Sequence, residues 1–78
     1  KSAGLEIVEV RVLPESPVVG KTLGEVGLSR SCNLALIIRD KQFITPTAET
    51  TLFPNDDVFA LVTREGEDEL RRAFGTLE

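Results

Sequence analysis

The sequence predicts a small α+β domain with a mixed or antiparallel sheet and two helices, in the order β-α-β-β-β-α. Three features carry this prediction. Apolar and polar residues alternate over 5–13, which is typical of a half-buried strand. Leu34–Ile38 and Val58–Val62 are continuous apolar runs, as expected for strands covered on both faces. From Glu65 onward, apolar residues recur at helical spacing. We interpret 1–78 as a single domain, because a chain of this length builds one core.

The first predicted strand has two different faces. One face carries Val8, Val10 and Val12, and the other carries Glu9 and Arg11. Ile7 and Leu13 also fall on the charged face, so we expect another subunit or domain to cover part of it.

The segment after this strand allows two interpretations. Gly20-Lys21-Thr22 matches the end of a phosphate-binding P-loop, but Glu15 occupies the place of the first glycine of that motif. A carboxylate there would repel phosphate, so we favour a plain connection to a short helix. Thr22 and Glu25 have the spacing of a capping box, and Gly27 is placed to end the helix in the left-handed conformation.

The rest of the chain predicts a hairpin, a turn, a strand and a helix. A polar turn over 39–42 joins Leu34–Ile38 to a return strand, which Pro46 confines to the sheet edge. Asn55 suits a positive φ in the turn before Val58–Val62, which we expect to be the central strand. The apolar stripe of the last helix consists of Leu70, Ala73, Phe74 and Leu77.

Composition argues against several functions. The net charge of −4 argues against nucleic-acid binding, so we predict no nucleic-acid polymer as partner. The chain has no histidine, tyrosine or tryptophan, and Cys32, its single cysteine, has no base beside it in the sequence. We therefore predict no enzymatic activity and interpret Cys32 as a buried structural thiol. The chain starts without methionine, and we expect it to be an excised piece of a larger protein.

Two groups of residues are candidate binding sites. Asp56, Asp57 and Glu49 could hold a hard cation, although a plain turn is the favoured interpretation. The second group could form a groove for a small anionic ligand, with aliphatic walls and one guanidinium. It consists of Ile37, Ile38, Arg39, Ile44 and Pro46. The alternative is a hairpin core with an exposed turn arginine.

In this order and spacing, the motifs resemble those of the TrkA C-terminal domain family, the RCK C-domain. The resemblance covers about 5–74 and rests on Ser16-Pro17-Val18-Val19-Gly20-Lys21-Thr22-Leu23-Gly24-Glu25-Val26, then Ile37-Ile38-Arg39, Ile44-Thr45-Pro46 and the turn over 52–58. The chain departs from the family pattern at Asn55, which replaces the usual glycine.

The resemblance implies a cytoplasmic, non-catalytic domain at the membrane face of a potassium channel, potassium transporter or cation/proton antiporter. It implies a homodimer that acts on the membrane transport module of its parent protein. In some members a ligand such as the cyclic dinucleotide c-di-AMP binds at the dimer interface, near the hairpin. The alternative is a purely structural dimerisation module without a ligand. We predict no cofactor, because the Gly-x-Gly-x-x-Gly fingerprint of dinucleotide binding is absent.

Overall fold

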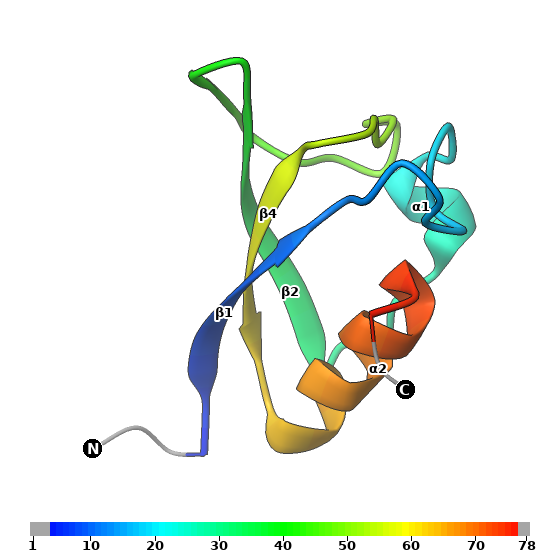
Figure 1. Cartoon of the computed structure of the whole chain (residues 1–78). Helices are drawn as coiled ribbons and strands as arrows, with labels where there is room; N and C mark the ends of the chain where they lie inside the picture. Colours follow the sequence, from blue (N-terminus) through cyan, green and yellow to red (C-terminus); the bar gives the residue numbers. More distant parts are fainter. Residues whose placement is uncertain (1–3, 77–78) are drawn as a thin grey trace.

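The computed structural model describes residues 4–76 and contains one antiparallel sheet with two helices. The elements in chain order are β1 (Glu6–Arg11), α1 (Leu23–Val26), β2 (Cys32–Arg39), β3 (Gln42–Ile44), β4 (Asp57–Val62) and α2 (Arg64–Phe74). Both helices lie on the same side of the sheet (Figure 1). The predicted order β-α-β-β-β-α is confirmed, and of the two sheet types expected, the antiparallel one is present.

The strands are ordered β1-β4-β2-β3 across the sheet. β4 pairs with both β1 and β2, which confirms that it is central. The β2–β3 hairpin turns at Asp40 and Lys41, whose φ values of 50° and 66° are those of the two-residue turn that fits strand twist. β3 is a short edge strand that ends before Pro46, as predicted.

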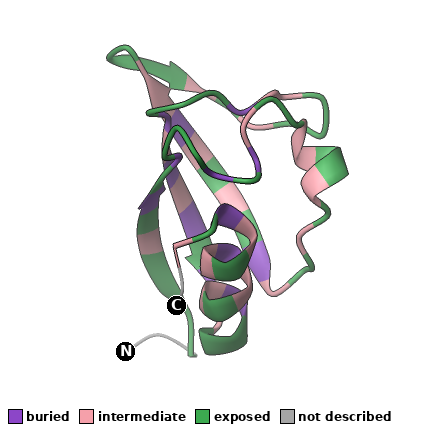
Figure 2. Ribbon diagram, turned by 45° about the vertical axis from the view of Figure 1, so that its right-hand side comes forward, coloured by how far each residue is buried: buried purple, intermediate pink, exposed green. Residues whose placement is uncertain are grey.

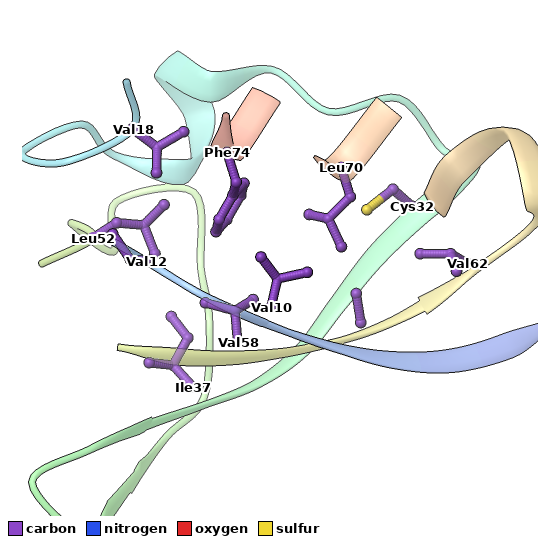
Figure 3. Packing of buried hydrophobic residues seen from close by; sticks show 11 residues of the cluster. Val10, Val12, Val18, Cys32, Ile37, Leu52, Val58, Val62, Leu70 and Phe74 are labelled. Atoms are coloured by element: carbon purple, nitrogen blue, oxygen red, sulfur yellow. The ribbon is translucent and has the colours of Figure 1, made fainter. Parts of the chain in front are cut away.

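The core fills the space between the sheet and α2. Leu70 and Phe74 of α2 point toward Val10 and Val58 of the two strands that pair beneath the helix (Figure 3). All four are buried, so the alternating valines and the helical stripe do meet as predicted. Leu77, the last residue of the predicted stripe, lies outside the described residues.

The connection from β1 to α1 leads into a short helix that begins with the predicted capping box. The Thr22 side chain accepts a hydrogen bond from the Glu25 backbone N–H at 3.2 Å, and the Glu25 carboxylate accepts one from the Thr22 N–H at 2.8 Å. Gly27 ends the helix with a φ of 69°. α1 has only four residues, so the long helix that a P-loop precedes does not form here.

Two contacts between distant parts of the chain fix α2. The Ser16 hydroxyl, which is buried, donates a hydrogen bond of 2.8 Å to the Phe74 carbonyl near the C-terminal end of the helix. Near the N-terminal end, Gly66 packs so closely on the backbone of Ser31 that an added Cβ would overlap the Ser31 carbonyl. Neither contact was predicted from the sequence.

One prediction about the sheet is wrong for the single chain. The apolar runs in β2 and β4 were expected to be covered on both faces, but the described residues cover only the face toward the helices. Ile7 and Phe43 lie on the other face and are 75% and 78% exposed. The exposed positions of the outer strands are visible in Figure 2. Coverage of this open face by another subunit or domain stays a prediction.

Candidate functional site: an ion-paired arginine and an apolar cleft

Arg39, the predicted anion-binding residue, is held in an ion pair at the end of β2. Its Nε donates to Asp56 Oδ1 and its Nη2 to Asp56 Oδ2, both at 2.8 Å. The Asp56 side chain is 1% exposed, whereas that of Arg39 is 28% exposed. The hydrogen bonds that Arg39 donates to the Asp56 carboxylate raise the pKa of Arg39 above its usual value, so the guanidinium keeps its charge.

The surrounding turn adds further contacts to this pair. Nη2 of Arg39 also donates to the Thr51 carbonyl at 2.9 Å, and the guanidinium stacks 4.6 Å from the ring centroid of Phe53. The Phe53 backbone N–H donates to Asp56 Oδ2 at 2.9 Å. Asn55 has the positive φ that was predicted, at 73°. Arg39 therefore joins the hairpin to the turn that leads into β4.

The same contacts give two members of the acidic group, Asp56 and Asp57, a structural role in the turn. Asp56 binds Arg39, while Asp57 pairs with Arg11 of β1 at 2.9 Å. Because each carboxylate already has its own arginine, the turn interpretation accounts for both of them. In residues 4–76, the structure contains no group of three histidine, cysteine or acidic side chains that could hold a metal ion.

The structure separates the remaining residues predicted to line a groove. Ile37 is fully buried in the core, and Ile44 pairs with it from β3. Ile38 lies on the opposite face of the sheet, where it pairs with the exposed Phe43. Pro46 lines the cleft between α1, β2 and the segment after β3, whereas the other four members of the predicted set do not line this cleft.

This cleft has a volume of about 250 Å³ and lies between α1, β2 and the segment that follows β3. Its lining residues are Leu23, Gly24, Leu28, Cys32, Leu34, Pro46, Thr47 and Ala48. None of these side chains is charged. The cleft thus offers mostly apolar side chains and one hydroxyl, and no side-chain charge that could bind a phosphate.

Cys32 belongs to this wall but has the properties of a structural thiol, as predicted. It is 7% exposed, and burial, together with the nearby charge of Glu69, raises its pKa to about 11. The thiolate that nucleophilic attack needs is therefore scarce at neutral pH.

Most residues of the cleft are not predicted from the sequence. The sequence predicts a strand covered on both faces for Leu34, and nothing in it marks 47–51 as part of a site. One feature of the sequence indicates that part of β2 has no neighbouring strand. The run from Cys32 to Ile38 is much longer than the return strand before Pro46, so part of β2 had to be left without a neighbour on that side.

The four-stranded antiparallel sheet with two helices on one face is the small α+β fold that the sequence predicts. The sequence profile described as the TrkA-C domain matches residues 7–75, and the chain belongs to this family. One curated relative is the Trk system potassium uptake protein trkA homolog 1 of Methanosarcina mazei, which is 26% identical over 72 residues. That alignment covers 92% of this chain but 18% of the relative.

Solved structures show the same fold at low sequence identity. The RCK_C domain dimer of S. agalactiae BusR in complex with c-di-AMP has a TM-score of 0.79 and 19% identity, with 91% of this chain and 97% of that chain covered. BusR from S. agalactiae in complex with its promoter DNA has a TM-score of 0.80 and 20% identity, with 97% of this chain and 38% of that chain covered. Because a DNA complex is among these neighbours, the absence of nucleic-acid binding stays a prediction.

The helices of the described region, 4–76, are all too short or too polar to cross a membrane.

Proposed function

We propose that this chain is a regulatory domain of a potassium or cation transport protein, that two copies pair, and that c-di-AMP binds where they meet. Membership of the TrkA-C family supports the regulatory role, and the curated relative is a potassium uptake protein. The observation that carries the ligand proposal is the apolar cleft, in a fold shared with an RCK_C dimer that holds c-di-AMP. Because the domain would act on the membrane transport module of its parent protein, it would lie in the cytoplasm at the membrane face.

The cleft and Arg39 would contact different parts of such a ligand. The walls around Pro46 and Leu34 fit a purine ring, which is apolar on its faces. Within residues 4–76, Arg39 uses Nε and Nη2 in its hydrogen bonds, which leaves Nη1 to donate to a phosphate oxygen. Ile37 has no exposed surface and takes no part.

Ligand binding would regulate transport by changing the relative populations of different arrangements of the paired copies. A ligand that contacts both copies favours one arrangement of the pair, and the transport module responds only through the difference in affinity between arrangements.

Blocking the cleft tests the ligand proposal. Ala48 lines the cleft, whereas its neighbour Glu49 is exposed and does not. In calorimetric titrations with c-di-AMP, we expect Ala48→Trp to weaken binding about tenfold or more and Glu49→Trp to leave it unchanged. Equal binding by Ala48→Trp and the unmodified chain would place the ligand elsewhere.

A second candidate function is a structural dimerisation module without a ligand. The observation in its favour is the ion pair of Arg39, because a guanidinium committed to Asp56 is a poor partner for phosphate. This function predicts a dimer that binds no c-di-AMP in the same titrations.

A further inference from the structure

The segment after β3 is joined to α1 by backbone hydrogen bonds. We call residues 46–52 the strap, which runs beside α1 (Figure 1). The Gly24 N–H donates to the Ala48 carbonyl at 2.9 Å. The Leu23 N–H donates to the Thr50 carbonyl, also at 2.9 Å. The strap and α1 are therefore one hydrogen-bonded unit.

The contact between the strap and α1 continues at the start of the helix. An isolated antiparallel bridge pairs Thr22 with Thr51. Next to it, the Leu52 N–H donates to the Lys21 carbonyl at 2.9 Å. All four residues of α1 keep some exposed surface, so the position of this helix depends on these backbone bonds as well as on the core.

The cleft lies between this unit and β2. Cys32 and Leu34 of β2 line the cleft on one side. Leu23 and Gly24 of α1 and Ala48 of the strap line it as well. The width of the cleft therefore depends on where the strap and α1 lie relative to β2.

Arg39 joins the strap to β2. It is the last residue of the strand that carries Cys32 and Leu34, and its Nη2 donates to the Thr51 carbonyl at 2.9 Å. Among residues 4–76, this is the only hydrogen bond between the strap and β2. The buried Leu52 side chain anchors the same end of the strap in the core. Arg39 itself does not line the cleft.

The guanidinium of Arg39 is held in one orientation by Asp56. Nη2 carries two N–H groups, and it donates to Asp56 Oδ2 as well as to the Thr51 carbonyl. Nε donates to the other oxygen of the same buried carboxylate. Because the side chain is fixed in this way, its bond to Thr51 also fixes the end of the strap.

We propose that Arg39 is a positioning residue for the cleft, which holds the strap and α1 as one unit at a fixed distance from β2. Loss of the hydrogen bond to Thr51 lets this unit move away from β2 and opens the cleft. The inference goes beyond the proposed function, because it concerns the chain alone and holds with or without a ligand. It follows that an Arg39 variant changes the cleft although the guanidinium is not part of its wall.

Cys32 is a built-in probe of this movement. It is the single cysteine of the chain, and it lines the cleft while only 7% exposed. Labelling with iodoacetamide, which is uncharged, followed by mass spectrometry measures how often the thiol becomes accessible. Arg39→Lys keeps a positive charge beside Asp56 but loses the planar fork that serves both acceptors. We expect the labelling rate to rise about tenfold in Arg39→Lys and further in Arg39→Ala.

Two controls separate local movement from global unfolding, with the stability of each variant measured by urea unfolding. Arg11→Ala removes an exposed ion pair away from the strap and should leave the labelling rate unchanged. Val10→Ala weakens the core from β1 without changing the wall of the cleft, so it should accelerate labelling far less than Arg39→Lys. Unchanged labelling in Arg39→Lys, or equal acceleration by Val10→Ala at an equal loss of stability, would overturn the proposal.

Amide hydrogen exchange followed by NMR tests the α1 end of the unit. In Arg39→Lys, the N–H groups of Leu23 and Gly24 should exchange about tenfold faster, although Arg39 does not bind either residue. Amides of the β1–β4 pair, which report global unfolding, should change less. If exchange accelerates at Leu52 but not in α1, the two segments do not move together and the proposal fails. Neither experiment contains c-di-AMP, so failure of this inference leaves the proposed function standing.

Discussion

Arg39 and Asp56 form a two-pronged ion pair, in which Nε and Nη2 each donate to one carboxylate oxygen at 2.8 Å. The pair connects the end of β2 to the turn before β4, across 17 positions of the chain. Arg39 therefore has a structural role whether or not it also contacts a ligand. A loss of binding in an Arg39 variant has two possible causes, and its stability must be measured first.

Removal of the guanidinium should destabilise the fold. Arg39→Ala leaves the buried Asp56 carboxylate without its charge partner, so we expect the free energy of unfolding to fall by about 2 kcal/mol or more. Arg11→Ala is the matched control, because the pair of Arg11 with Asp57 is exposed and should change stability little. Urea unfolding of the three proteins provides the comparison. An Arg39→Ala variant as stable as the unmodified chain would show that the pair contributes nothing.

Gly66 provides a test in which two physical effects have opposite signs. Alanine is favoured over glycine inside a helix by about 1 kcal/mol, which alone predicts that Gly66→Ala is stabilising. The added Cβ would overlap the Ser31 carbonyl, so we expect a net loss of about 1–3 kcal/mol instead. Asp68→Ala, at an exposed position of the same helix, should have little effect. Stabilisation by Gly66→Ala in thermal or urea unfolding would mean that α2 packs less closely than described.

The raised pKa of Cys32 predicts a loss of stability at alkaline pH. In the folded chain the pKa is about 11, above the usual value of 9.0, so the unfolded chain releases the thiol proton first. The contribution of the protonated Cys32 thiol to the free energy of unfolding is complete below pH 9 and is lost as the pH rises to about 11. The unfolding midpoint of the unmodified chain should therefore fall more steeply over this window than that of Cys32→Ala. Parallel slopes for the two proteins would contradict the assigned burial of the thiol.

Local patterns were the most predictable part of the fold. The capping box of Thr22 with Glu25, the positive φ of Asn55 and the edge position of β3 all depend on residues close in sequence. The contacts of Ser16 with Phe74 and of Gly66 with Ser31 were not predictable in this way. They join residues far apart in the chain, and no local pattern marks which residues will meet.

The candidate site was predicted less well, for a reason that the sequence already contains. Ile37, Ile38 and Arg39 are consecutive in a strand, and consecutive strand residues point to opposite faces of the sheet. Within one chain they therefore lie on both faces of the sheet, and a groove that they line between two copies stays a prediction. Pro46 does line the cleft, but the other walls come from α1 and β2, which only the tertiary fold brings together.

Calorimetric titration of the 78-residue chain with c-di-AMP, with the dimer checked by sedimentation, tests the central claim most directly. If one c-di-AMP molecule binds where two copies meet, saturation will occur at one c-di-AMP for every two chains, and the ligand will shift the chain further toward the dimer. Saturation at one ligand per chain, or no saturable binding by a chain that is dimeric, would contradict the shared site.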